Sequence, residues 1–420
     1  MPGPTSEITG ASAAVAAAPA VEPPARWAIL AILSVAQLLG MSLWFTASAT
    51  AAQLAALWDL DAGGAASLTT AVQLGFVAGT ALAALLNLAD LIPARRYLAA
   101  SAVAAAAANA ALLVASGPGS ALVSRFLTGF FLAGVYPPAM KMAATWFRAS
   151  RGLAIGTVVG ALTVGKALPY LIGAVSTVDY RFVVVTTTMG ALLAAALIAA
   201  AYRDGPFPFP SRPFSLRLVA TIVRHRETRL AIGGYLGHMW ELYAMWAGVS
   251  LFFHDFFAAR GTGAAQALML AGFVAFGAIA AGGAGSVAAG VWADRFGREN
   301  IAALAMAVSG ACALVIGWLS AAPAPIVVAL ALLWGFAVVA DSAQFSALVT
   351  EVAPTHAVGT ALTLQTSLGF LLTAFSIWLT VEVSTRFGWG PAFGMLALGP
   401  VLGIRTMLRL RTLRAAAAHT

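Results

Sequence analysis

Five ionisable side chains lie within long apolar stretches of this sequence: Arg125, Lys166, His238, Glu241 and Asp341. A charged side chain near the middle of a membrane helix costs at least about 2.5 kcal/mol on insertion scales, so such a residue is a functional candidate. A buried carboxyl group can load and release a proton near physiological pH, and histidine exchanges one in the same range. We therefore expect proton transfer inside a membrane, and we assign it to Glu241, Asp341, His238 and Arg125.

The spacing of these residues suggests that they share a site. His238 and Glu241 are three residues apart, and Asp341 and Gln344 repeat that spacing. Helical residues three apart share one face, so each pair points in one direction. We expect both pairs to face one aqueous cleft. The alternative is a structural hydrogen-bonded pair that holds the second half of the chain together.

Lys166 is the cation best placed to hold a substrate carboxylate, and a structural ion pair with Asp341 or Glu241 is the alternative reading. Uncharged polar and aromatic residues in neighbouring apolar stretches could complete its pocket, although each of them alone is more often a packing residue. The substrate-binding set that we expect beside Lys166 is Gln37, Tyr136, Tyr170, Trp246, Gln344 and Gln365, with Trp44 and Tyr243 as further possibilities.

The composition identifies the kind of chain that positions these side chains. Of its 420 residues, 61% are hydrophobic and only 9% are charged, which is too few charges to cover a soluble protein of this size. The net charge of +8 is distributed between the apolar stretches, so we expect no nucleic-acid partner. The single Cys312 excludes a disulfide framework, and we expect no metal, no cofactor and no catalytic residue.

We predict an all-α membrane protein with twelve transmembrane helices in two pseudo-symmetric six-helix bundles. Apolar stretches long enough to cross a bilayer recur along the whole chain. The predicted spans are 27–49, 67–88, 97–115, 120–143, 152–174, 182–201, 230–253, 266–290, 300–320, 326–349, 358–381 and 391–408.

The predicted domain boundaries follow from these spans. A tail (1–26) precedes the first bundle (27–201), a Pro- and Arg-rich linker (202–229) leads to the second (230–408), and a second tail (409–420) follows. Most Lys and Arg residues fall on the side of the N-terminus, whereas only Arg181, Arg260 and Arg386 fall on the other. The positive-inside rule then places both termini in the cytoplasm, and we expect a monomer in a bacterial inner membrane.

A polar motif separates two of the predicted spans. Residues 290–299 fit the pattern G-x-x-x-D-R-x-G-R, and a degraded copy containing Asp90 occupies residues 87–96, about half a chain earlier. The pattern resembles the loop signature of the major facilitator superfamily, a family of twelve-helix secondary transporters. The resemblance implies a conformational lock that stabilises an outward-open state. Its residues would be Gly290, Asp294, Arg295, Gly297, Arg298 and Asp90.

Two further segments are similar to motifs of that superfamily. Arg125-Phe-Leu-Thr-Gly129 resembles the fourth-helix motif R-x-x-x-G, whose arginine is associated with proton coupling; bonding to backbone carbonyls at helix ends is the alternative role. The glycine-rich stretch 156–173 resembles the fifth-helix motif of the antiporters, but it has Lys166 where that motif has proline. The proline comes later, at Pro169, and should kink that helix, as Pro137 and Pro138 should break or bend span four.

These observations predict a secondary active transporter that moves a small organic anion by proton-coupled alternating access. The two bundles would rock about a site at the membrane midplane. The alternative within the same class is a proton-coupled exporter of drugs or metabolites, an antiporter whose acidic residues receive a cationic substrate. A membrane enzyme or a receptor is the reading from another class. The sequence lacks the clustered acids or paired histidines of such an enzyme, and the twin halves argue against a receptor. The expected partners are the substrate, protons and the lipid bilayer.

Overall fold

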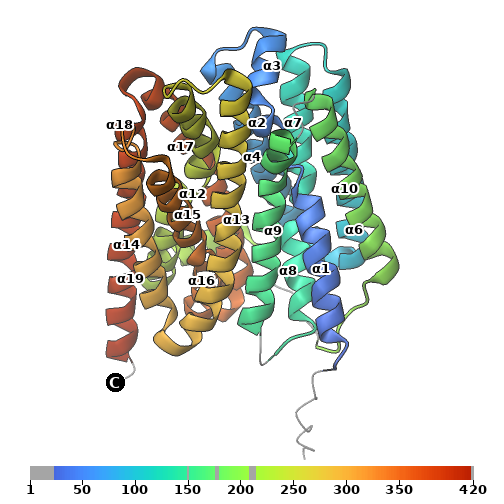
Figure 1. The fold of residues 1–420 in the computed structure, drawn as a ribbon. Helices are drawn as coiled ribbons and strands as arrows, with labels where there is room; N and C mark the ends of the chain where they lie inside the picture. Colours follow the sequence, from blue (N-terminus) through green and yellow to red (C-terminus); the bar gives the residue numbers. More distant parts are fainter. Residues whose placement is uncertain (1–22, 149–150, 176–178, 208–213, 418–420) are drawn as a thin grey trace, which may run out of the picture.

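The computed structural model describes residues 23–148, 151–175, 179–207 and 214–417, and every regular element in these ranges is a helix. Figure 1 shows two groups of helices side by side, one built from the first half of the chain and one from the second. The predicted all-α membrane fold with two helical bundles is therefore confirmed. The beginning of the first helix and the end of the last one lie at the same end of the molecule (Figure 1).

The helices of the first half are mostly long, with short ones between them. In chain order they are α1 (Arg26–Met41), α2 (Thr46–Ala49), α3 (Ala51–Trp58), α4 (Ala62–Leu85), α5 (Leu88–Leu91), α6 (Ala94–Ala110), the 3-10 helix η1 (Ala111–Val114), α7 (Pro118–Leu132), α8 (Tyr136–Ala144), α9 (Arg151–Val175) and α10 (Tyr180–Ala201).

A short helix, α11 (Leu216–Arg224), precedes the second half. The helices of that half are α12 (Arg226–Ala258), α13 (Ala264–Phe296), α14 (Arg298–Ile316), α15 (Ala324–Ala340), α16 (Ser342–Val352), η2 (Thr355–Ala357), α17 (Val358–Phe387), α18 (Trp389–Gly394), η3 (Met395–Ala397) and α19 (Leu398–Ala417).

Ten helical stretches of the described chain are long and apolar enough to cross a membrane. Two of the twelve predicted spans are not among them. In the first, 27–49, the longest helix is α1 with 16 residues, because the helix stops at Met41. The seventh, α12, has 33 residues but also carries polar side chains such as His238 and Glu241. Exposed apolar side chains on the outer face of α10, among them Phe182, Val185, Met189 and Leu193, suit contact with lipid.

Three predicted spans are interrupted near their middle. Span one breaks between α1 and α2, and span ten breaks at Asp341, between α15 and α16; the sequence analysis predicted neither break. Span four breaks between α7 and α8, where Pro137 and Pro138 occupy the first turn of α8, as predicted. The helix α9 continues through Pro169 without interruption.

The two halves meet along pairs of helices, with α9 packed against α13 and α4 against α17. Glycines allow the first pair to approach closely. A Cβ atom at Gly160 would lie 3.0 Å from the carbonyl oxygen of Gly283, and a Cβ at Gly283 would lie 3.0 Å from that of Gly160. Within the first half, a Cβ at Gly165 would overlap the carbonyl group of Leu38 on α1. Small residues at helix crossings are the usual means of close packing in membranes.

Candidate functional site

Lys166 lies in an aromatic cage at the interface between the two halves. Its ammonium nitrogen is 4.1 Å from the ring centroid of Trp44, 4.8 Å from that of Tyr243 and 5.5 Å from that of Trp246. It also donates a hydrogen bond to the hydroxyl of Tyr243. Only 3% of Lys166 is exposed, so the cage removes the ammonium from solvent. Trp44 comes from the first half and the other two rings from α12, so both halves build the cage.

Two rings of the cage carry indole N–H donors that have no acceptor among the described residues. The indole nitrogens of Trp44 and Trp246 are buried and have no hydrogen-bond partner there. No described carboxylate lies within ion-pairing distance of the Lys166 ammonium, so the expected alternative, an ion pair with Asp341 or Glu241, is absent. A buried cation with unpaired N–H groups beside it can hold an anion, because buried donors are normally satisfied.

More aromatic rings extend the cage on both sides. Phe45 lies 5.8 Å from Tyr170 and 6.0 Å from Trp246 between ring centroids. On the other side, Phe76 on α4 and Phe370 on α17 are 4.4 Å apart. Phe370 also contacts Trp44 and Tyr243, at 5.6 Å and 5.3 Å. The polar centre is therefore enclosed by aromatic rings from five helical spans, three in the first half and two in the second.

Arg125 on α7 is fully buried and binds backbone instead of a carboxylate. Its guanidinium donates to the carbonyl oxygens of Leu43 and Trp44, at 2.7 and 2.9 Å, and to Asn109 Oδ1 at 2.7 Å. Leu43 and Trp44 lie in the break between α1 and α2, where helical hydrogen bonds are lost. This is the alternative role stated above, and it makes Arg125 a positioning residue for the Trp44 ring.

Glu241 on α12 is buried within the second half. One carboxylate oxygen accepts from Trp334 Nε1 on α15 at 2.7 Å, and the other accepts from Ser309 Oγ on α14 at 2.8 Å. Both partners lie in the same bundle, away from the first half. The carboxylate is therefore bonded to neighbours inside this bundle, and it does not line the Lys166 cage.

His238 and Asp341 form a buried pair. His238 Nδ1 lies 2.7 Å from Asp341 Oδ1, and its Nε2 lies 3.0 Å from Ser342 Oγ. Each side chain of the pair is about 2% exposed. Asp341 stands at the break between α15 and α16, so the pair connects α12 to the point where span ten changes direction.

The structure separates the residues that were expected to share one cleft. Arg125 lies inside the first half, Glu241 inside the second, and Lys166 between them. Of the expected substrate residues, Tyr170 and Trp246 lie at the cage, and the Tyr170 hydroxyl donates to the Trp246 carbonyl oxygen at 3.4 Å. Three others have partners elsewhere: Gln37 donates to Val135 O, Gln365 to Ser346 Oγ, and Gln344 accepts from Arg298. Tyr136, at the start of α8, is half-buried.

The motif residues gather at the end of the molecule where α13 turns into α14. A Cβ at Gly152, in the first turn of α9, would lie 3.6 Å from Asp294 Oδ2, so this carboxylate faces the start of a helix from the other half. Arg298 contacts Glu351 Oε1 at 2.8 Å and Gln344 Oε1 at 3.0 Å. Arg414 extends the charged network within the second half, joining Glu299 and Glu351.

Of the two motif glycines, one lies in the turn between α13 and α14 and the other does not. Gly297 has a φ of +84°, a conformation that suits glycine, and it separates α13 from α14. Gly290 is not in the turn but within α13, where a Cβ atom would lie 3.5 Å from the Gly152 carbonyl oxygen, an ordinary contact distance. Arg295 is exposed. The side chain of Asp90 lies outside the described part of the structure.

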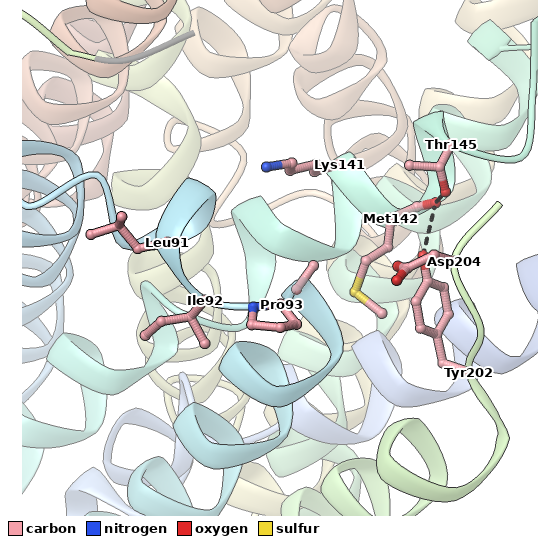
Figure 2. Close-up of a pocket in the computed structure, with 9 residues that line it drawn as sticks. Leu91, Ile92, Pro93, Lys141, Met142, Thr145, Tyr202 and Asp204 are labelled. Atoms are coloured by element: carbon pink, nitrogen blue, oxygen red, sulfur yellow. Dashed lines mark hydrogen bonds between the residues drawn. The ribbon is translucent and has the colours of Figure 1, made fainter. Parts of the chain in front are cut away.

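A separate pocket of about 270 Å³ opens beside α5, α6 and α8 in the first half. Figure 2 shows Lys141, Asp204 and Tyr202 among its lining, with the Tyr202 hydroxyl 3.4 Å from the carbonyl oxygen of Met142. None of the residues that line it belongs to the Lys166 cage. The predicted substrate residues are absent from this lining as well.

Several residues of these groups were missed by the sequence analysis. The cage residues Phe45, Phe76 and Phe370 look like ordinary core residues in the sequence, and only the breaks and crossings of the helices bring them together. Trp334 and Ser309 partner Glu241 from distant spans. Asn109 was detectable, because an amide in the apolar stretch 97–115 is a polar group at membrane depth.

Two helical bundles that enclose a buried, donor-rich site between them define an integral membrane protein of the transporter class. The sequence model of the Major Facilitator Superfamily matches residues 30–377, so the chain belongs to that superfamily. A search of curated proteins found no match to this chain.

Solved structures with the same fold include three transporters. The human organic anion transporter MFSD10 (TETRAN) is 15% identical, with a TM-score of 0.66 over 92% of this chain and 100% of that one. A bacterial homologue of the human lysosomal transporter Spinster, inward-facing and unoccupied, is 14% identical, with a TM-score of 0.64 over 94% and 96%. A mutant of the nucleoside transporter NupG is 14% identical, with a TM-score of 0.67 over 91% and 99%. At these identities the likeness establishes the fold alone.

Proposed function

We propose that this protein is a secondary active transporter that moves a small organic anion together with protons by alternating access. The observation that carries the proposal is the buried ammonium of Lys166 with the two unpaired indole N–H groups of Trp44 and Trp246 beside it. A carboxylate would accept from all three and would neutralise the buried charge. MFSD10, which has this fold, is an organic anion transporter, and this agrees with that substrate class.

The carboxyl groups of the second half supply the proton sites in this proposal. Ser309 Oγ donates to Glu241 but also lies 3.3 Å from the carbonyl oxygen of Met306. When Glu241 takes up a proton, Ser309 can turn its own hydrogen to Met306 and accept from Glu241, so both protonation states are satisfied. The His238–Asp341 pair offers a second site, in which one proton lies between an imidazole and a carboxylate.

Rocking of the halves 27–201 and 230–408 would open the Lys166 cage, because its rings come from both. The glycine-lined crossing of α9 and α13 and the contact of Asp294 with the start of α9 would separate at one end of the molecule during the cycle. In this proposal the protein works as a monomer in a bacterial inner membrane, with both termini in the cytoplasm.

Transport by purified protein in liposomes tests the proposal. We expect accumulation of a radiolabelled organic carboxylate when an inward proton gradient is imposed, and its loss when a protonophore collapses the gradient. Lys166→Met should abolish uptake, whereas Lys141→Met, which removes a lysine far from the cage, should not. Uptake that does not depend on the proton gradient would refute proton coupling. Normal uptake by the Lys166→Met variant would refute the anion site.

The exporter remains a second candidate because of one observation. An ammonium already lies within 5.5 Å of three aromatic rings, so the cage accommodates a cation. An organic cation would then displace a deprotonated Lys166. Efflux of a quaternary ammonium compound from the same liposomes, together with indifference to carboxylates, would favour this function over anion transport.

A further inference from the structure

The aromatic side chains of the cage around Lys166 restrict the shape of the anion as well as its charge. This step rests on the proposed function, since it asks which organic anion the same site would take. Trp44, Tyr243 and Trp246 contact the ammonium, and Phe76 and Phe370 continue the aromatic wall behind Trp44. An aliphatic hydroxy acid or an inorganic anion could use the donors but could not stack with any of these rings.

The charged groups in and near the cage limit the ligand to one negative group. Lys166 is the cation of the cage, whereas the guanidinium of Arg125 is committed to Asn109 and two backbone carbonyls. The imidazole of His238 is paired with Asp341. A dianion would therefore bring a second charge into a buried site that has no described cation to meet it, at a high desolvation cost.

We propose that the site selects a planar aromatic monocarboxylate. The carboxylate would accept from the Lys166 ammonium and from the indole N–H groups of Trp44 and Trp246. The ring would pack between faces of the first half, Trp44 and Phe45, and faces of the second half, Tyr243 and Phe370. Offset-stacked and edge-on contacts of this kind are favourable between aromatic rings.

The position of Trp44 makes it the main determinant of this selectivity. Its ring lies 5.1 Å from Phe76 and 5.6 Å from both Tyr243 and Phe370, so it touches rings from α4, α12 and α17. Its backbone carbonyl is held by Arg125 in the break between α1 and α2. A regular helix through residues 42–45 would carry this side chain in another direction, so the break and the arginine together aim it at Lys166.

The test compares ligands of similar size that differ in aromatic character or in charge, on the purified full-length protein. Benzoate is planar and aromatic, cyclohexanecarboxylate has the same charge on a saturated ring, phthalate carries a second carboxylate, and benzylamine is a cation. Binding is measured by isothermal titration in detergent, and transport by exchange in liposomes. We expect benzoate to bind at least ten times more tightly than the other three and to be exchanged across the membrane.

The variants separate the two contributions of Trp44. Trp44→Phe keeps a ring but loses the N–H, so it should weaken both carboxylates and keep the preference for benzoate. Trp44→Leu should abolish the preference. Trp378→Leu, which removes an exposed tryptophan on the outside of α17, should leave both affinities unchanged.

Each outcome decides between the two claims. Equal binding and transport of benzoate and cyclohexanecarboxylate would overturn the aromatic selectivity and leave the proposed anion transport intact, as would tighter binding of phthalate. Binding of benzylamine in preference to every carboxylate, or no binding of any carboxylate, would overturn both.

Discussion

Glu241 shows how a single buried carboxyl group is prepared for two protonation states. Its two oxygens accept from Trp334 and Ser309, and Ser309 has a second acceptor in Met306 O within reach. The tryptophan N–H can only donate, so it always requires an acceptor oxygen on Glu241. The serine hydroxyl can reverse its direction. This asymmetry identifies Oε2, the oxygen beside Ser309, as the one that would carry the proton.

Glu241→Gln should abolish proton-driven accumulation while preserving exchange of substrate across the membrane. The amide oxygen can accept from Trp334, and its NH₂ group can donate to Ser309, so the bundle keeps its hydrogen bonds but loses its titratable group. Accumulation and exchange measured in the same liposome preparation check this. Ser309→Ala serves as the control that removes the partner and keeps the acid. Accumulation at the normal rate in the Gln variant would exclude Glu241 from coupling.

Arg125→Lys should lower both thermal stability and affinity for the anion, although it keeps the charge. A single ammonium cannot replace a planar guanidinium that bonds Leu43 O, Trp44 O and Asn109 together. Each buried acceptor left unpaired costs about 1–3 kcal/mol. Melting in detergent and ligand titration measure the two effects. Arg95→Lys, an exposed arginine that bonds Ala199 O, is the matched control, and equal behaviour of the two variants would contradict the positioning role.

Many individual residues of the site could be recognised from residue type alone. Lys166, Glu241, His238 and Asp341 stand out because a charge inside an apolar stretch is expensive. Their grouping could not be predicted, because it depends on the rotation of each helix about its axis. The i, i+3 spacing of His238 and Glu241 does place them on one side of α12, yet their partners differ in position: Asp341 follows the end of α15, whereas Trp334 lies within α15 and Ser309 lies on α14.

Broken helices are the feature of the elements that matters most to the site. The sequence predicted the break at Pro137 and Pro138, because proline removes a backbone donor and clashes with the preceding turn. The breaks at 42–45 and at Asp341 have no such local signal, since their cause is tertiary: Arg125 satisfies the carbonyls of the first, and His238 binds the side chain at the second. Long apolar stretches therefore predicted where the spans lie but not where they are interrupted.

Gly165→Ala should destabilise the protein, although alanine normally favours a helix. The added Cβ would overlap the Leu38 carbonyl on α1, and backbone cannot move aside as a side chain can. Since Lys166 is the next residue, the shift would also disturb the cage. Gly119→Ala, where a Cβ meets nothing within 4 Å, should keep or slightly raise the melting temperature. Equal melting temperatures for the two variants would argue against tight packing at Gly165.

At the scale of the whole molecule, alternating access requires the α9–α13 crossing to separate at one end. Gly152 and Gly290 form that crossing beside Asp294, where a Cβ at Gly290 would lie 3.5 Å from the Gly152 carbonyl oxygen. Cysteines at both positions, in a Cys312→Ala background, should form a disulfide on oxidation and stop transport. Reduction should restore transport. A cross-linked protein that transports at the normal rate would show that this end does not open.

The two-bundle architecture was the most predictable property of the molecule. Span number, the repeat of the loop motif and the asymmetry of positive charges depend on composition along the chain, which a sequence displays directly. The contacts between the halves depend on which glycines meet across the interface. Gly160 lies opposite Gly283, and no local sequence pattern predicts this contact. The Lys166 cage lies in that interface, which explains why its aromatic residues could not be assigned beforehand.

The charged network at the α13–α14 turn has a consequence for how the protein responds to its medium. All four residues of this network belong to the second half, so they would move together in a rocking motion: Arg298, Glu351, Arg414 and Glu299. Dissolved salt weakens such surface pairs. A rise in ionic strength should then weaken the contacts among α14, α16 and α19. These pairs do not cross between the halves, so their loss should not change the ratio of inward-facing to outward-facing protein.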